Sequence, residues 1–292
     1  MIPLLEGMRP RQWIKNAIVP AALLFALGDQ EQTIDGPAVL RAAAAFCLFC
    51  LASSAVYLLN DVKDRDLDRL HPTKRLRPIA AGRLSIRTAL MGAGFAAVLS
   101  VGLGGLLTPR FGLIVALYLI MQVAYTHGVK RIPVADVLTI AAGFILRAYG
   151  GAVAIQVTIS HWLLLCTGLL ALFLGFCKRR HEKVVLKDLK DQARPVLQHY
   201  TEAGLDQLIA LVGGATLTAY LLYTLSPDTL EKFGNHRLVA TIPFVALGLW
   251  RYYRLVYQHE KGGRPEQVLL TDIPLLSIVA CFGATALWAF LW

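Results

Sequence analysis

The chain reads PAVLRAAAAFCLFCLASSAVYLL over residues 37–59 and continues directly as NDVKDRDLD over residues 60–68. A helix that crosses a bilayer needs about 20 mainly apolar residues, so the first stretch predicts a membrane span and the second marks where it leaves the lipid. On a continuous helix Asp61, Asp64 and Asp68 fall at i, i+3 and i+7 and line one face. The sequence therefore predicts three carboxylates together at one membrane surface.

The acidic stretch has the composition of a magnesium site. Carboxylates held this close raise one another's pKa unless cations neutralise them. Oxygen ligands without Cys or His suit Mg²⁺, which binds through a few carboxylates together with substrate phosphates. Asn60 adds an amide oxygen beside Asp61. We therefore expect a metal–phosphate site here; the alternative is a solvated acidic helix end that pairs with Lys63, Arg65 and Arg69.

Apolar runs of spanning length recur along the whole chain. Of its 292 residues 56% are hydrophobic and 16% are charged, whereas soluble domains carry about 25% charged residues. Because backbone in lipid must satisfy its own hydrogen bonds, we expect these runs to be helices. The sequence predicts an all-α, polytopic membrane protein with a single domain over 1–292 and nine spans, at 12–28, 37–59, 86–107, 111–127, 134–156, 161–177, 204–225, 237–257 and 270–292.

Lysine and arginine residues gather in alternate loops. With a cytoplasmic amino terminus, most of the 29 basic residues fall in inside segments, while the outside loops hold acidic residues such as Asp29 and Glu231. This bias follows the positive-inside rule and predicts an amino terminus inside the cell and a carboxyl terminus outside. The net charge of +10 then reflects loops that face anionic head groups or an anionic substrate, and it indicates no nucleic-acid partner.

A cationic loop follows the acidic stretch. It reads HPTKRLRPIAAG over residues 71–82, where Pro72 and Pro78 stop helix propagation and Gly82 permits a tight turn. Arginine grips phosphate oxygens with two donors, and lysine acts on them as a point charge. The alternative is an ordinary positive-inside loop. However, three cations held between two prolines favour phosphate contacts from Lys74, Arg75 and Arg77.

Two further polar clusters fall on the same predicted membrane surface. The first is a hairpin with Tyr125 and Lys130, for which an ordinary basic hairpin is the alternative. The second follows the sixth span, and part of it must be a solvated amphipathic helix. Its members nearest the membrane, and therefore its site candidates, are Lys178, Arg179 and Glu182.

Three polar residues inside predicted spans are singled out. Lys15 and Asn16 lie deeper than the interfacial anchoring that explains Trp13, so they are site candidates. Arg147 lies in the fifth span, where an ionisable residue is costly and usually faces the bundle interior. We expect it to bond backbone carbonyls between helices. Pairing with Asp136 is not expected, because about 16 Å of helix rise separates the two.

Together these motifs resemble the UbiA superfamily of intramembrane transferases. The pattern N-D-x-x-D-x-x-x-D of residues 60–68, followed by H-P-T-K-R-x-R-P-I-x-x-G of residues 71–82, is specific for that family, and Tyr125 with Lys130 fits its second hairpin. The resemblance covers nearly the whole chain. It implies a nine-helix bundle whose cytoplasmic cap holds Mg²⁺ and a diphosphate over a cavity open to lipid.

One segment departs from the usual family pattern. Prenyl-diphosphate members carry a second aspartate-rich motif after the sixth helix, where this chain reads KRRHE over residues 178–182. The extra cations suit a donor with more phosphate. Within the superfamily the chain is similar to the decaprenyl-phosphate phosphoribosyltransferases of mycobacterial cell-wall synthesis, on RPRQWxKN of residues 9–16, SAVYLxNDV of residues 54–62 and KRxxE of residues 178–182.

This similarity implies transfer of 5-phosphoribose from phosphoribosyl pyrophosphate to a polyprenyl phosphate, with release of pyrophosphate, at the cytoplasmic face of a bacterial plasma membrane. It implies that Asp61 and Asp64 are essential for catalysis, and that Mg²⁺ binds to Asn60, Asp61, Asp64 and Asp68. The implied substrate-binding residues are Lys15, Asn16, Tyr57, Lys74, Arg75, Arg77, Tyr125, Lys130, Lys178, Arg179 and Glu182.

Two rival functions stay open at this point. A prenyltransferase that joins an isoprenoid diphosphate to an aromatic acceptor uses the same first motif, although the second acidic motif that would favour it is absent. A transporter or channel with a cation site predicts carboxylates at the membrane midplane, whereas only Arg147 is deep here. The expected partners are phosphoribosyl pyrophosphate, a polyprenyl phosphate and membrane lipids. A second copy of the chain, in a homo-oligomer, is a further candidate partner.

Overall fold

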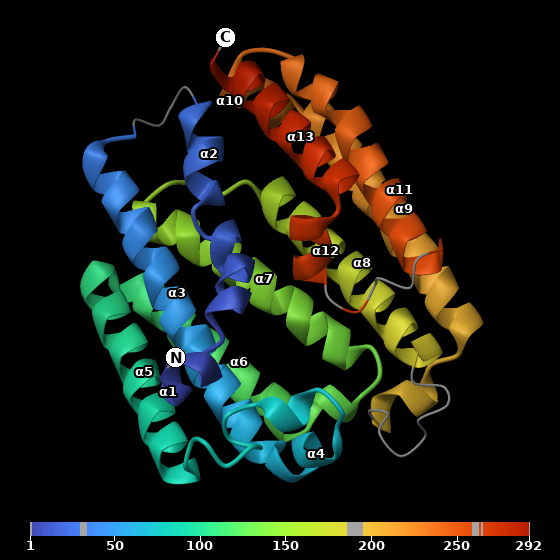
Figure 1. The fold of residues 1–292 in the computed structure, drawn as a ribbon. Coiled ribbons are helices and arrows are strands. Elements are labelled where there is room, and N and C mark those ends of the chain that lie inside the picture. Colours follow the sequence, from blue (N-terminus) through green and yellow to red (C-terminus); the bar gives the residue numbers. More distant parts are fainter. Residues whose placement is uncertain (1, 30–33, 186–194, 259–262, 264, 292) are drawn as a thin grey trace.

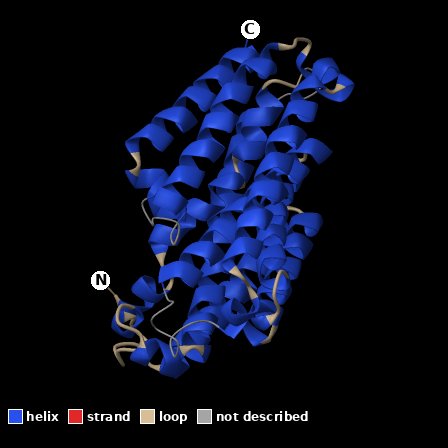
Figure 2. Ribbon diagram, turned by 90° about the vertical axis from the view of Figure 1, so that its right-hand side faces the viewer, coloured by secondary structure: helices blue, strands red, loops and turns tan. Residues whose placement is uncertain are grey.

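The computed structural model describes the chain except for residues 1, 30–33, 186–194, 259–262, 264 and 292 and the side chains of residues 195 and 266. Within the described residues the regular elements are all helices, and none is a strand (Figure 2). Long helices run side by side through the body of the bundle, and several of the short ones lie near its ends (Figure 1). The predicted all-α class is confirmed.

Seven helices in the described part of the chain are long and apolar enough to cross a membrane. Side-chain oxygens of Asp35, Ser85, Thr108 and Thr201 accept backbone N–H groups where four of them begin, which satisfies donors that have no partner inside a helix. The seven are α3 (Gly36–Lys63), α5 (Ile86–Leu107), α6 (Pro109–His127), α7 (Ala135–Ile155), α8 (His161–Val185), α9 (Glu202–Leu225) and α13 (Ile273–Leu291).

The shorter elements connect these helices or cover their ends. They are α1 (Pro3–Gly7), η1 (Pro10–Ile18), α2 (Ala21–Leu27), α4 (Arg65–Leu70), η2 (Lys74–Leu76), η3 (Val129–Arg131), η4 (Pro195–His199), α10 (Pro227–Phe233), η5 (Arg237–Thr241), α11 (Ile242–Gln258) and α12 (Pro265–Thr271), where η denotes a 3-10 helix.

Two of the nine expected spans are not single helices. The run 12–28 is divided between η1 and α2, and the run 237–257 is divided between η5 and α11. Proline has no N–H to donate, so Pro20 and Pro243 interrupt the helical hydrogen bonds at these divisions. Nine continuous spans are therefore not confirmed, since the described residues contain seven.

The division of the first run is packed directly against α7. A Cβ on Gly151 would stand 1.9 Å from the carbonyl oxygen of Val19, far inside any contact distance, so glycine is required there. The η1 segment also contacts α3. Its polar side chains are thereby held between two long helices.

Burial separates central helices from helices at the edge. In the most apolar window of each helix, 56% of residues are buried in α3 and 50% in α7, against 22% in α5 and 17% in α13. One apolar core forms around Phe49, Phe111 and Tyr118, and a second forms around Phe173 and Tyr252. Thus α3 and α7 are central, while α5 and α13 present apolar side chains to lipid.

Candidate functional site

The acidic motif lies where α3 ends and α4 begins. Asp64, with φ −92° and ψ 8°, ends the first helix and precedes the second, so the expectation of one continuous helix is wrong at this residue. The interruption is small, because the N–H of Asp64 bonds the Asn60 carbonyl and that of Asp68 bonds the Asp64 carbonyl, each at 2.8 Å. The motif therefore keeps nearly helical geometry across the junction.

Arg77 joins the two buried carboxylates of the motif. Its Nη1 lies 3.1 Å from Asp61 Oδ1 and 2.6 Å from Asp68 Oδ2. Both carboxylates are buried, and one guanidinium reaches both, so they face the same side as the spacing predicts. The loop that carries Arg77 thus folds back over the end of α3.

The hairpin between α6 and α7 meets the motif from another direction. Lys130 Nζ donates to Asp64 Oδ1 at 2.7 Å, and the Thr126 hydroxyl donates to the amide oxygen of Asn60. The structure therefore brings Lys130, predicted from sequence as a phosphate contact, to the acidic motif. Together Arg77 and Lys130 place two cationic side chains from separate segments around these carboxylates.

Arg9 is a third cation here, and sequence reasoning missed it as a site residue. Its guanidinium donates to Asp61 and lies 5.1 Å from the centre of the Tyr57 ring. Its φ of 54° is in the left-handed region, an uncommon conformation outside glycine that often marks a functional position. Burial lowers the pKa of Arg9, and Asp61 opposes that shift. Two signals were available in the sequence: Arg9 directly precedes Pro10 at the start of a span, and it begins the RPRQWxKN stretch that carries part of the resemblance.

The cationic loop has the turn predicted for it. Gly82 has φ +76°, and Arg83 at the end of the loop donates to both carboxylate oxygens of Glu6 at 2.7 Å, which ties the loop to α1. Burial, together with the nearby Lys74, lowers the pKa of His71. The neutral ring suits its contacts, because His71 Nδ1 accepts the backbone N–H of Thr73 at 3.3 Å.

The donor set of the motif fits a divalent cation. The described residues contain no group of three or more His, Cys, Asp or Glu side chains already placed around one point. However, Asp61 Oδ2 is buried and has no hydrogen-bond partner among them, an arrangement that is costly and therefore rare. A metal ion bound to that oxygen would satisfy it. Oxygen atoms of Asn60, Asp64 and Asp68 are the neighbouring ligands that Mg²⁺ prefers.

A second charged cluster ties α7 to α8. Arg179 Nε lies 2.6 Å from Asp136 Oδ2, and Arg179 Nη1 lies 2.6 Å from Glu182 Oε2. The Tyr200 hydroxyl donates to Asp136 Oδ1 at 2.9 Å and accepts the backbone N–H of Val134. Arg179 and Glu182 were predicted to bind substrate. Their substrate role stays a prediction. In this structure Arg179 forms ion pairs with both Glu182 and Asp136.

Breaking this cluster should destabilise the protein. Arg179→Met leaves the carboxylate of Asp136 buried without its cation, which costs about 3–5 kcal/mol for a buried pair. We expect a large drop in the thermal unfolding temperature of the detergent-solubilised protein. The matched control is Arg180→Met, because the partner of Arg180, Asp206, has a side chain that is 40% exposed. Equal losses in the two variants would contradict this assignment.

The other predicted residues take varied positions. Arg75 is exposed, whereas Asn16 is buried. The half-buried members of the predicted set are Lys15, Tyr57, Lys74, Tyr125 and Lys178.

Arg147 forms hydrogen bonds between helices, but to side chains and not to the backbone carbonyls that we expected. Its Nε donates to Asn16 Oδ1 at 2.7 Å, its Nη2 to the Tyr118 hydroxyl at 2.8 Å and its Nη1 to the Gly143 carbonyl at 3.0 Å. Only one of these partners is a backbone carbonyl, and it belongs to the same helix. Asp136 pairs with Arg179 instead, which confirms that it is not the partner of Arg147.

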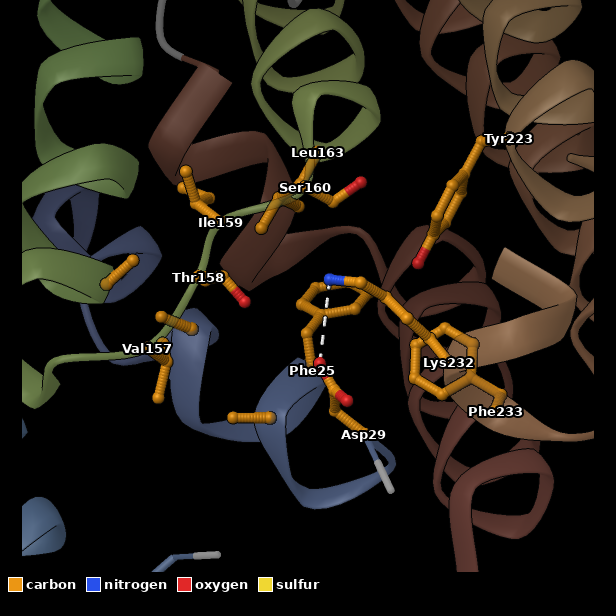
Figure 3. Close-up of a pocket in the computed structure, with 13 residues that line it drawn as sticks. Phe25, Asp29, Val157, Thr158, Ile159, Ser160, Leu163, Tyr223, Lys232 and Phe233 are labelled. Atoms are coloured by element: carbon orange, nitrogen blue, oxygen red, sulfur yellow. Dashed lines mark ion pairs between the residues drawn. The ribbon is translucent and has the colours of Figure 1, made fainter. Parts of the chain in front are cut away.

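A separate pocket lies at the other end of the bundle (Figure 3). It is lined mainly by apolar side chains such as Phe25 and Phe233. Lys232 Nζ lies 3.5 Å from Asp29 Oδ2 across it. None of the residues predicted for the site lines this pocket, so the acidic motif remains the candidate site.

The comparison with protein families decides the classification. The model of the UbiA prenyltransferase family matches residues 17–271, most of the chain. The chain belongs to the UbiA prenyltransferase family. It is a multi-pass membrane transferase. The acidic motif and its cationic loop are the stretch that resembles the UbiA pattern.

Curated relatives in this family extend over nearly the full chain. The decaprenyl-phosphate phosphoribosyltransferase of Mycolicibacterium smegmatis is 35% identical, with 96% of this chain and 91% of that protein covered. The enzyme of the same name from Corynebacterium glutamicum is 34% identical, with 92% and 81% covered.

Solved structures share the UbiA fold. A UbiA homologue from Archaeoglobus fulgidus bound to DMAPP and Mg²⁺ has a TM-score of 0.71 at 20% identity, with 98% of both chains covered. The apo structure of a homologue from Aeropyrum pernix has a TM-score of 0.72 at 16% identity, with 97% of this chain and 99% of that chain covered. At these identities the likeness establishes the fold.

Proposed function

We propose that this protein transfers 5-phosphoribose from phosphoribosyl pyrophosphate to a polyprenyl phosphate, with decaprenyl phosphate as the first choice, and releases pyrophosphate. The product is a precursor for cell-wall arabinan. The single observation that carries the proposal is the 35% identity over nearly the whole chain to a decaprenyl-phosphate phosphoribosyltransferase. The basic segment after the sixth predicted span, in place of a second acidic motif, supports a donor with more phosphate.

In this proposal the acidic motif and its cations hold the leaving group. Asp61 and Asp64, with Asn60 and Asp68, hold Mg²⁺, which supplies charge neutralisation for the departing pyrophosphate. The support is the oxygen donor set and the buried oxygen of Asp61 that lacks a partner among the described residues. Magnesium in a UbiA neighbour with bound DMAPP supports a divalent ion at the family level.

The cations of the site take the remaining phosphate oxygens. Arg77 and Lys130 already lie against the carboxylates of the motif, and Arg9 adds a third positive charge. As pyrophosphate leaves, positive charge develops at the ribose C1, and an oxygen of the acceptor phosphate attacks it. That oxygen is already anionic, so the step needs no general base. Catalysis then consists of positioning and electrostatic stabilisation. Lys74, Arg75 and Lys178 are the further cations that we assign to phosphate oxygens.

The proposed setting is a bacterial plasma membrane with the amino terminus and the site on the cytoplasmic side. The support is the distribution of basic residues over alternate loops. A phosphorylated, water-soluble donor reaches the site from the cytoplasm, and the polyprenyl tail remains in lipid. This division of the two substrates explains why a ribosyl transfer uses a membrane fold.

Purified protein in detergent or nanodiscs tests the function directly. With Mg²⁺, ribose-labelled phosphoribosyl pyrophosphate and decaprenyl phosphate, label should enter the organic-extractable lipid, and EDTA should abolish the transfer until excess Mg²⁺ restores it. A parallel reaction contains a labelled prenyl diphosphate and an aromatic acceptor. Transfer only in that reaction would overturn the proposal in favour of a prenyltransferase. That alternative is tested because two solved UbiA structures contain bound DMAPP or GPP.

A further inference from the structure

Arg147 is a buried cation to which the proposed mechanism assigns no role. It is 6% exposed and lies in the middle of α7. A guanidinium has five N–H groups, and three of them donate to Asn16, Tyr118 and Gly143, which are all uncharged acceptors. In the described part of the chain the other two N–H groups have no acceptor, and no carboxylate pairs with the charge.

Such a charge is expensive in a membrane. Ionisable residues inside spans pair with one another or with backbone carbonyls, and they mark substrate or ion pathways. Asp136, the acidic residue on the same helix, is already engaged by Arg179. The positive charge of Arg147 therefore lacks its anion within the described protein.

Two polar stripes lead from the acidic motif to this cation. On α6, Thr126 bonds Asn60, Gln122 lies one turn deeper, and Tyr118 bonds Arg147 another turn on. On α3, the stripe consists of Asn60, Tyr57, Ser53 and Cys50, and the last two accept from the amide nitrogen of Asn16. Apolar residues dominate the rest of both helices, so these stripes form a polar route between α3 and α6.

Arg147 lies deeper in the bundle than the acidic motif. Eight residues of α6 separate Thr126 from Tyr118, which is about 12 Å of helix rise. With pyrophosphate held at the motif, the attacking phosphate lies beyond the ribose C1, toward the lipid that holds its tail. A Cβ on Gly143 would lie 3.4 Å from Arg147 Nη1 and 3.2 Å from the amide nitrogen of Gln122. The Gln122 amide and the Arg147 guanidinium thus meet at the same position on Gly143, which places the α6 stripe beside the cation.

We infer that Arg147 binds the phosphate group of the polyprenyl acceptor and so selects a phosphorylated acceptor over a neutral one. The inference rests on the proposed function and deepens it. In the step itself an acceptor phosphate oxygen forms a bond to C1 while the bond from C1 to the pyrophosphate oxygen breaks. The electron pair of that bond leaves with pyrophosphate. Arg147 forms and breaks no covalent bond and transfers no proton; it holds the phosphate that acts as the nucleophile.

Steady-state kinetics of Arg147→Met and Arg147→Lys test this. A bond between ions contributes more than a neutral one, so Arg147→Met should raise the KM for decaprenyl phosphate by about tenfold or more, with the KM for phosphoribosyl pyrophosphate unchanged within about twofold. Arg147→Lys keeps the charge and should retain most of the acceptor affinity. The matched control, Arg41→Met, removes an arginine that bonds Gln156 at the far end of the bundle, and both KM values should stay unchanged.

The outcomes separate the inference from its rivals. A rise in the donor KM instead would assign Arg147 to the 5-phosphate of the donor and overturn the inference, as would equal losses in Arg147→Met and Arg147→Lys. If neither variant folds, the wild-type protein decides: decaprenyl phosphate must raise its thermal unfolding temperature more than decaprenol does, and equal shifts would overturn the inference. Failure of wild-type ribosyl transfer would reject the proposed function itself, which is a distinct result.

Discussion

Asp61→Asn should lower ribosyl transfer by about a hundredfold or more while the protein stays folded. The change keeps the shape of the side chain but removes the buried negative charge next to Arg9 and Arg77. Groups that stabilise charge in a transition state have effects of about 10²–10³ in turnover when one is removed. Rates are measured with labelled donor over a range of Mg²⁺ concentrations.

Asp66→Asn is the matched control for that variant. Asp66 belongs to the same acidic stretch, yet its side chain is 90% exposed and its nearest cation, on Arg69, is 3.9 Å away. It should keep near-normal turnover, because exposed pairs contribute little. Full activity in Asp61→Asn, or equal losses in both variants, would contradict the metal assignment. Thermal unfolding of each variant identifies any loss that comes from the unpaired arginines.

Gly151→Ala should have a large effect on folding, because no other glycine whose surroundings the structure describes has a closer backbone neighbour. The added methyl would stand 1.9 Å from the Val19 carbonyl oxygen, and backbone atoms cannot rotate away as a side chain can. The expected result is a loss of at least about 1–3 kcal/mol, the usual range for overpacking, and a lower yield of monodisperse protein. Size-exclusion profiles and thermal unfolding in detergent measure it.

Gly214→Ala provides the comparison. Gly214 also lies inside a spanning helix, but nothing stands within 4 Å of the position of its Cβ. Alanine favours helix over glycine by about 1 kcal/mol, so this variant should be neutral or slightly stabilised. A stable Gly151→Ala protein would mean that the division of the first run is not packed against α7 in the way described.

The helical class and the shared side of Asp61 and Asp68 were predictable because both depend on local pattern. Runs of about 20 apolar residues must become helices in lipid, and the spacing of Asp61 and Asp68 puts them on one side whether or not the helix bends between them. The contact of Arg77 with both carboxylates needs only that spacing and a loop that folds back over the end of α3.

The features that escaped prediction depend on tertiary contacts. Hydropathy averages over a window, so it did not register that Pro20 and Pro243 each end one hydrogen-bonded helix and begin another. Arg9 could not be identified because its backbone conformation and its approach to Asp61 follow from how η1 packs on α3. The partners of Asp136 were equally hidden, since Arg179 and Tyr200 are more than forty residues away in sequence.

The low burial of α5 and α13 has a consequence for how this fold can change over evolutionary time. Their outward side chains need only be apolar, whereas α3 and α7 carry polar residues whose neighbours are specified one by one. A lineage whose lipids become longer or shorter can therefore adjust the two peripheral helices residue by residue. Such changes leave the polar residues of α3 and α7 unaltered.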